Sequence, residues 1–374
     1  MPIEPFKLER YYAKYEFSAR YMLSSSDCES RPIGEILAFE PGAAERLQQV
    51  WLGYTEVPGA PELREAIGAL YTATTPGQIH VHTGAEEAIY TFFNALVGPG
   101  DHVIVQTPCY QAALSIPRAL GCAISAWPGR EVDGWMPDLD ALAGLIQPNT
   151  KALYLCSPAN PTGFQFSADA FRRVIDLAEA RGIVVFSDEV YRELEHDPAL
   201  RLPAACDLGE RAVSLGVMSK AYGLAGLRIG WAASRNTALL AGMASVKDYL
   251  SICASAPSEF LAAIALRHRE ILVRRNLGLI RRNLVLVDAF LAQRPDLFSW
   301  IRPQAGPIGF VKYRGAGTTE DFCQRVVEGC SVLLAPGELY ERPGYFRLGF
   351  GRASLPEALA TLEMWIAGSS GLVR

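Results

Sequence analysis

Short apolar runs alternate with amphipathic segments through the middle of this chain. Apolar positions recur at helical spacing in three segments, which predicts helices over residues 62–71, 84–93 and 170–180. The apolar runs between and after them predict buried strands, at residues 79–82, 102–106, 151–156, 183–186, 212–215 and 228–232. Strands that alternate with helices indicate an α/β fold, with a mostly parallel sheet covered by helices on both faces.

The two ends of the chain differ from this middle. Residues 1–45 are mixed aromatic and charged, and predict an N-terminal arm of helix and loop that joins the small domain; Ser24 to Ser26 are interpreted as a turn and not as a ligand loop. A long helix is expected from 267 to about 293. The remaining apolar runs predict a smaller α+β domain, with strands at 310–313, 332–334 and 345–350 and a helix over 356–367. The expected domains are 46–280, large, and 281–374, small.

Composition narrows the class of protein. The chain has 374 residues, enough for two domains, and a net charge of −5, which gives no basic surface for nucleic acid. Its 8 cysteines form no C-x-x-C pair, which is typical of a reducing compartment. The five histidines show no metal-ligand spacing beyond His80 and His82, which alternate along a predicted strand and so do not favour a zinc site. Neither a signal peptide nor a membrane-spanning run is expected. We therefore expect a cytoplasmic protein without a membrane, nucleic-acid or metal partner.

One lysine stands between an apolar strand and a glycine-rich loop. Lys220 follows Ser219, and Arg228 comes eight residues later between Gly226 and Gly230. A lysine at a strand end suits Schiff-base chemistry, and a hydroxyl with a guanidinium suits a phosphate. An aldehyde and a phosphate in one molecule indicate pyridoxal phosphate. A solvated lysine in a turn would be the simpler interpretation of this segment alone.

Further polar residues follow other predicted strands, where ligands of parallel sheets bind. Asp188 could keep the pyridine nitrogen of the cofactor protonated, and Tyr191 could donate to the 3′ oxygen. A helix cap by Ser187 or Asp188 is about equally favoured. Asn160 precedes a proline, which favours an extended backbone with the amide projecting, although an Asn-Pro turn is common.

Two more segments fit the same cofactor. The helix that begins near Gly84, Ala85 and Glu86 offers free backbone N–H groups for phosphate, provided that the acidic side chains of Glu86 and Glu87 point away. Tyr110 could stack on the cofactor ring. A partly buried core tyrosine is the alternative for Tyr110.

These motifs together resemble the class I/II aminotransferases, which are fold-type I pyridoxal-phosphate enzymes. The resemblance rests on Asn160-Pro161-Thr162-Gly163, on Ser187 to Tyr191, and on Ser219-Lys220 through Gly230, and it runs from Tyr54 to Phe350. It implies that Lys220 forms the Schiff base with the cofactor. It also implies that Asp188 pairs with the pyridinium nitrogen and that Asn160 and Tyr191 donate to the 3′ oxygen. The backbone N–H groups of Ala85 and Glu86 would bind the phosphate, and Tyr110 would stack on the ring.

The same resemblance assigns the remaining positions. Ser219 and Arg228 match phosphate ligands. Arg347 matches the arginine whose guanidinium binds the substrate α-carboxylate through two N–H groups. Tyr54 resembles a tyrosine that crosses a homodimer interface to the neighbouring phosphate. Many relatives carry a serine or threonine three residues before the lysine, where this chain has Val217, so one phosphate contact is expected to be missing or replaced.

The family likeness implies transamination between an L-amino acid and a 2-oxo acid through the Lys220 Schiff base. The segments from Lys220 to Trp231 and from Lys247 to Cys253 are most similar to the branch that contains capreomycidine synthase. That branch implies the alternative, an elimination and cyclisation on an arginine-like amino acid with the same cofactor. A non-catalytic regulator of the same ancestry is disfavoured, because every cofactor position is filled and no DNA-binding segment is appended.

Overall fold

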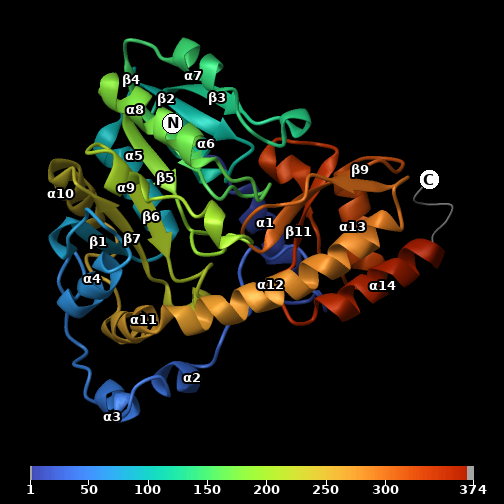
Figure 1. The fold of residues 1–374 in the computed structure, drawn as a ribbon, viewed down its shortest axis with the longest axis horizontal. Coiled ribbons are helices and arrows are strands. Elements are labelled where there is room, and N and C mark those ends of the chain that lie inside the picture. Colours follow the sequence, from blue (N-terminus) through green and yellow to red (C-terminus); the bar gives the residue numbers. More distant parts are fainter. Residues whose placement is uncertain (1, 369–374) are drawn as a thin grey trace.

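A seven-stranded sheet forms the larger part of the protein (Figure 1). The computed structural model describes residues 2–368. The strand order is β1-β7-β6-β5-β4-β2-β3; β7 is antiparallel to β1 and β6, and the other neighbouring pairs are parallel. The strands are β1 (Ile79–His82), β2 (His102–Thr107), β3 (Ala123–Pro128), β4 (Thr150–Cys156), β5 (Val184–Asp188), β6 (Val213–Val217) and β7 (Gly230–Ser234). The predicted mostly parallel sheet is confirmed.

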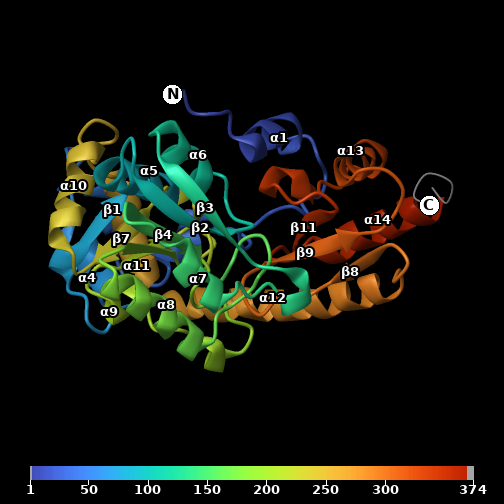
Figure 2. The ribbon, with the colours of Figure 1, turned by 90° about the horizontal axis from the view of Figure 1, so that it is seen from above.

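Helices cover both faces of this sheet, as Figure 2 shows edge-on. Successive side chains of a strand point to opposite faces, so Tyr154 of β4 packs in one hydrophobic cluster and Leu153 and Leu155 pack in the other. The helices of the first face are α5 (Ala85–Leu96), α6 (Ala112–Ala119) and α10 (Thr237–Lys247). Those of the second face are α7 (Leu139–Leu145), α8 (Ala168–Ala180) and α9 (Ala205–Leu208).

A smaller antiparallel sheet with its own helices confirms the predicted α+β domain. Its order is β10-β11-β9-β8, with β8 (Phe298–Trp300), β9 (Ile308–Tyr313), β10 (Ala335–Pro336) and β11 (Tyr345–Gly349). The helices α13 (Thr319–Cys330) and α14 (Leu355–Gly368) belong to this part. The long helix α12 (Arg269–Ala292) extends from the large sheet to the small one and passes through residue 281, so the expected boundary falls inside a helix (Figure 1).

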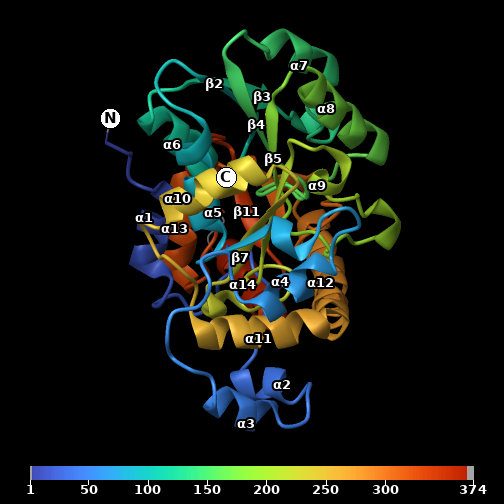
Figure 3. The ribbon, with the colours of Figure 1, turned by 90° about the vertical axis from the view of Figure 1, so that its left-hand side faces the viewer.

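The N-terminal segment attaches to the small sheet. The Tyr21 N–H donates to Ser331 O, and the Leu333 N–H donates to Tyr21 O. Figure 3 shows α2 and α3 beneath α11, away from the large sheet. The helices of this region are α1 (Lys7–Tyr15), α2 (Ile33–Leu37), α3 (Ala43–Gln48), α4 (Pro61–Gly68) and α11 (Ala256–Arg267). Short 3₁₀ helices occupy Pro76–Gln78, Glu131–Asp133, Pro198–Leu200, Ala225–Leu227 and Gly337–Tyr340.

Two expected strands differ in the structure. Residues 332–334 do not form a strand: Val332 makes a single bridge to Tyr21, and the paired residues are Ala335–Pro336. The strand expected from 228 begins at Gly230, because Arg228 has a left-handed backbone with φ 52°. The first error comes from an apolar run whose bridge partner, Tyr21, lies far away in the sequence, and the second comes from the backbone conformation of Arg228. No helix in the described part of the chain is long and apolar enough to cross a membrane.

Candidate active site

The loops that follow five strands meet at one edge of the large sheet. The strands are β1, β2, β4, β5 and β6, and a cavity of about 410 Å³ lies where their loops converge. Ligands of open parallel sheets bind at this edge. Of the twelve residues that the sequence analysis assigns to cofactor or substrate, nine line the cavity, namely Ala85, Glu86, Tyr110, Asn160, Asp188, Tyr191, Ser219, Lys220 and Arg228.

Lys220 lines this cavity and follows the end of β6. Its Nζ donates a hydrogen bond to Ser26 Oγ at 2.9 Å. Burial lowers the pKa of Lys220, and the carboxylate of Asp27 opposes that shift. A lowered pKa increases the share of neutral amine near neutral pH, which is the form that attacks an aldehyde or accepts a proton.

Asp188 ends β5 and faces the same cavity. Its Oδ2 accepts a hydrogen bond from the Tyr154 hydroxyl at 2.8 Å, and its Oδ1 accepts one from the Val190 N–H at 3.3 Å. Burial raises the pKa of Asp188. The Asp188 carboxylate makes no ion pair with a described residue. A buried carboxylate without a cation is costly, so a protonated ring nitrogen beside it would be stabilising.

Tyr191 and Asn160 have hydrogen-bonding capacity left over. The Tyr191 hydroxyl is buried and lies near the Ser26 side chain, but it forms no hydrogen bond of normal geometry to a described residue. The Asn160 Oδ1 accepts from Arg347 Nη1 at 3.2 Å, which leaves the Asn160 amide N–H groups to donate elsewhere. Buried polar groups normally find partners, so both side chains indicate a ligand oxygen in the cavity.

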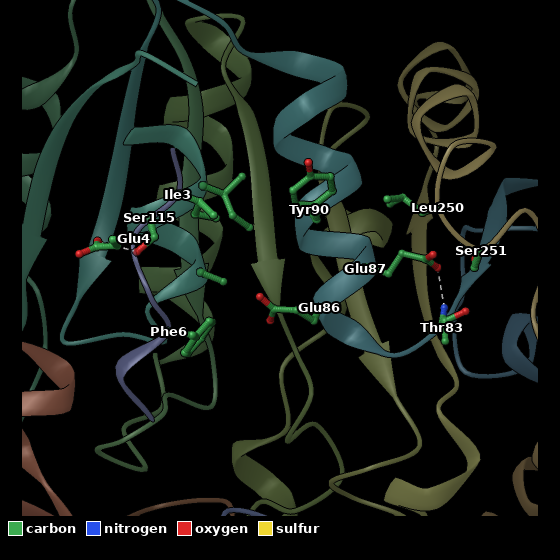
Figure 4. A pocket seen from close by; sticks show the side chains of 12 residues that line it. Ile3, Glu4, Phe6, Thr83, Glu86, Glu87, Tyr90, Ser115, Leu250 and Ser251 are labelled. Carbon is green, nitrogen blue, oxygen red and sulfur yellow. Dashed lines mark hydrogen bonds between the residues drawn. The ribbon is translucent and has the colours of Figure 1, made fainter. Parts of the chain in front are cut away.

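The start of α5 and Arg228 form the phosphate-binding end. Gly84 has φ +85°, and a Cβ on Gly84 would lie 2.4 Å from Arg228 Nη2. Glu87 is turned away, since its Oε2 accepts from the Thr83 N–H at 2.6 Å, as Figure 4 shows. Glu86 lines the cavity, so Glu87 is the one of the two acidic residues that is turned away. Arg228 lies beside the start of α5, where the N–H groups of the first helical turn can face an anion. Val217 adds only an apolar side chain to this wall.

Replacing Gly84 with alanine should weaken pyridoxal-phosphate binding about tenfold. The methyl group strains a left-handed backbone by about 1–2 kcal/mol and displaces the Arg228 guanidinium. Equilibrium titration of the apoprotein measures the dissociation constant. The Gly98→Ala variant is the matched control, because nothing lies within 4 Å of its added Cβ. Equal affinities of the two variants would contradict this arrangement of the phosphate end.

Arg347 is a fully buried cation directly behind Asn160. Its Nε and Nη2 donate to Ser24 O at 3.0 and 2.7 Å, and Nη2 also donates to the Tyr12 hydroxyl at 2.7 Å. No described carboxylate forms an ion pair with this guanidinium. A buried, unpaired charge is costly, so the site favours an anionic ligand such as a substrate carboxylate.

Sequence reasoning missed the contribution of the N-terminal segment. Tyr12, Ser24 and Ser26 contact Arg347 or Lys220, which lie about 200 to 330 positions later. The interpretation of Ser24 to Ser26 as a turn was therefore incomplete, because the turn lies against the site. The run of three hydroxyl residues was the only local signal, and the contact itself depends on the tertiary fold.

Tyr54 lies outside this cavity. It is 81% exposed, and Trp51 and Leu52 beside it are exposed to a similar degree. The structure therefore does not bring Tyr54 to the cofactor cavity of its own chain.

The residues of the cavity fit pyridoxal phosphate. They supply a lysine of lowered pKa, a buried carboxylate, an unpaired tyrosine hydroxyl and a glycine cradle beside an arginine. The model of the family "Aminotransferase class I and II" matches residues 23–362. The chain belongs to this family. Its cofactor is pyridoxal phosphate.

Relatives of this aminotransferase-family enzyme include proteins of two activities. Capreomycidine synthase of Streptomyces vinaceus is 31% identical over 368 residues, which cover 97% of this chain and 92% of the relative. A pyridoxal-phosphate-dependent aminotransferase from Streptococcus suis has a TM-score of 0.93 and 32% identity, over 98% of this chain and 99% of the other. The pyridoxal-phosphate-dependent cyclase OrfR has a TM-score of 0.91 and 30% identity, over 98% of each chain.

Proposed function

We propose that this enzyme is an aminotransferase that moves an amino group between an L-amino acid and a 2-oxo acid. The observation that carries the proposal is the buried, unpaired guanidinium of Arg347, which contacts Asn160 on the wall of the cavity that also holds Lys220. An amino acid carries a carboxylate and an amine on one carbon. The site offers a cation for the first and a lysine for the chemistry of the second.

Each side chain then has one task. Arg347 binds the substrate α-carboxylate and so orients the α-carbon. When bound, pyridoxal phosphate withdraws electrons from that carbon and acidifies its proton. Lys220 Nζ takes the α-proton as general base and later returns a proton as general acid, which its lowered pKa favours. Asp188 holds the positive charge of the ring nitrogen.

The likeness to capreomycidine synthase and to OrfR favours a second candidate. In this alternative, Lys220 and Asp188 serve in the same way, but the substrate loses a β- or γ-substituent and closes a ring. The substrate would be an arginine-like amino acid. The residues that line the cavity suit the α-proton abstraction that both reactions require.

A reaction without any added 2-oxo acid tests the proposal. Transamination should stop after about one 2-oxo acid per active site, because no acceptor is present to take the amino group onward. The purified holoenzyme, a panel of amino acids and mass spectrometry of the products supply the measurement. Repeated turnover with loss of a side-chain group would show that the enzyme is an eliminating or cyclising enzyme.

We also infer that the active unit is a homodimer in which Tyr54 of one subunit reaches the phosphate site of the other. The exposed loop with Trp51, Leu52 and Tyr54 supports this inference. The protein should sediment at about twice the chain mass of 40.8 kDa. Tyr54→Phe should weaken cofactor affinity a few-fold without changing that mass, since one hydroxyl hydrogen bond contributes about 0.5–1.5 kcal/mol. A monomer that binds the cofactor with unchanged affinity would contradict the inference.

A further inference from the structure

The amine of Lys220 makes one hydrogen bond to the described part of the chain. Its Nζ donates to Ser26 Oγ at 2.9 Å. Ser26 belongs to the turn of residues 24–27, and it lies 194 positions before the lysine in the sequence. The group that acts as base in the proposed reaction is therefore held by a residue from the N-terminal segment.

The turn of residues 24–27 is itself fixed against the small sheet. The Ser24 carbonyl accepts two N–H groups of Arg347, at 3.0 and 2.7 Å. At the other end of the turn, a Cβ on Gly351 would lie 2.5 Å from Asp27 O, so the two backbones approach more closely than any residue but glycine permits. The turn therefore holds its side chains at set positions beside the cavity.

Two carboxylates face Lys220, and both are engaged elsewhere. Asp27 forms an ion pair with Arg352, whose Nη2 lies 3.0 and 3.1 Å from its two oxygens. Asp188 accepts a hydrogen bond from the Tyr154 hydroxyl at 2.8 Å. A carboxylate bound directly to the amine would strongly favour the charged ammonium, which cannot accept a proton. A serine oxygen is a neutral acceptor, and it holds the amine with a weaker preference for the charged form.

The hydroxyl of Ser26 could meet the amine in two ways. It could accept an N–H from Lys220, or it could donate its own proton to the nitrogen lone pair. The Tyr191 oxygen lies near the Ser26 side chain and offers that proton another acceptor. A Ser26 hydroxyl whose proton points to Tyr191 can only accept from Lys220. The lone pair of the neutral amine then stays free, and Tyr191 keeps its own proton for a ligand oxygen.

We propose that Ser26 is a positioning residue for the general base of the reaction. Its oxygen holds one N–H of Lys220 and its proton is directed to Tyr191, so that the lone pair of Nζ is left to take the substrate α-proton. The same turn binds Arg347 through Ser24 O, and so fixes the base relative to the cation for the α-carboxylate. This inference rests on the proposed function, since it assumes that Lys220 takes the α-proton, a step that transamination shares with the second candidate.

The pKa of Lys220 in the apoprotein tests the hydrogen bond itself. A hydrogen bond donated by an ammonium stabilises the charged form, so Ser26→Ala should lower that pKa by about one unit. The other titratable groups that face the lysine stay in place in this variant, namely Asp27, Cys28, Asp188 and Arg347. The pH dependence of Lys220 acetylation by acetic anhydride, followed by peptide mapping, measures the pKa. Ser25→Ala removes the neighbouring hydroxyl of the same turn, which makes no hydrogen bond to Lys220, and should leave the pKa unchanged.

Exchange of the substrate α-hydrogen in D₂O tests the positioning in the holoenzyme. Ser26→Ala should slow this exchange about ten- to a hundredfold, because the base is no longer held in place. The KM for the amino acid should stay within about twofold, since the backbone carbonyl that binds Arg347 is unchanged. A lower pKa leaves more neutral amine at neutral pH, so protonation of the base does not explain a slower rate. Ser26→Thr keeps the hydroxyl and should restore most of the rate.

The outcomes separate the inference from the proposed function. An unchanged pKa of Lys220 in the Ser26→Ala apoprotein, or an exchange rate equal to that of the wild type, would overturn the inference while transamination stands. A lowered pKa and slow exchange, in an enzyme that releases a side-chain group at every turnover, would support the inference and overturn transamination.

Discussion

An enzyme with alanine in place of Lys220 should convert its amino acid at least about a thousandfold more slowly than the wild type. The variant loses both the amine that forms the covalent link to the cofactor and the general base, and a positioned base alone contributes about 10²–10⁴-fold. Stopped-flow and steady-state assays on the cofactor-loaded proteins measure the loss.

Two further variants control this result. Lys220→Arg keeps the positive charge but cannot release its proton, so the loss should be as large. Lys151→Ala removes an exposed lysine and should have no effect. Small primary amines added to the Lys220→Ala variant should restore part of the rate, because the deletion leaves space where the Nζ lay. An alanine variant within about tenfold of the wild type would contradict the role of Lys220.

Arg347→Ala should lower kcat/KM for the amino acid by about two to three orders of magnitude. Removing one partner of a buried, hydrogen-bonded charge pair costs about 2–5 kcal/mol, and each 1.4 kcal/mol is a factor of ten. The loss should appear mainly in KM, because the carboxylate is bound in both the ground and the transition state. Cofactor affinity should change little, since Arg347 does not line the cofactor cavity itself.

Matched ligands and variants make this test specific. The decarboxylated amine of the same substrate should bind the wild type and Arg347→Ala equally. Arg347→Lys should lie between the two, because an ammonium keeps the charge but not the fork. Arg342→Ala, which loses a bond to Gly129 O away from the cavity, should behave as the wild type. An unchanged KM in Arg347→Ala would exclude the carboxylate role.

The sequence predicts the part of the site that follows strands. Buried parallel strands are continuous apolar runs, and their carboxyl ends share one edge of the sheet. Asn160, Asp188 and Lys220 each follow such a strand, so the sequence alone predicts that they lie at the same edge. The strand β3 was not predicted, because it is an edge strand whose side chains are exposed or half-buried at all positions but Trp127 and show no clear alternation. The roles assigned by family resemblance remain predictions.

The rest of the site could not be read from local patterns. Tyr12 and Ser24 meet Arg347 only because the N-terminal segment lies against the small sheet. Glu87 turns to the Thr83 N–H while Glu86, its neighbour in the sequence, lines the cavity. Such accounting depends on which charges lie side by side, and a linear sequence does not contain that information.

Borohydride reduction of the wild-type holoenzyme is the most direct test of the central claim, that Lys220 holds pyridoxal phosphate. Reduction should attach the cofactor permanently, and peptide mapping should place one phosphopyridoxyl group per chain on Lys220. The label on another lysine, such as Lys247, or a protein that takes up no cofactor would contradict this account of the site.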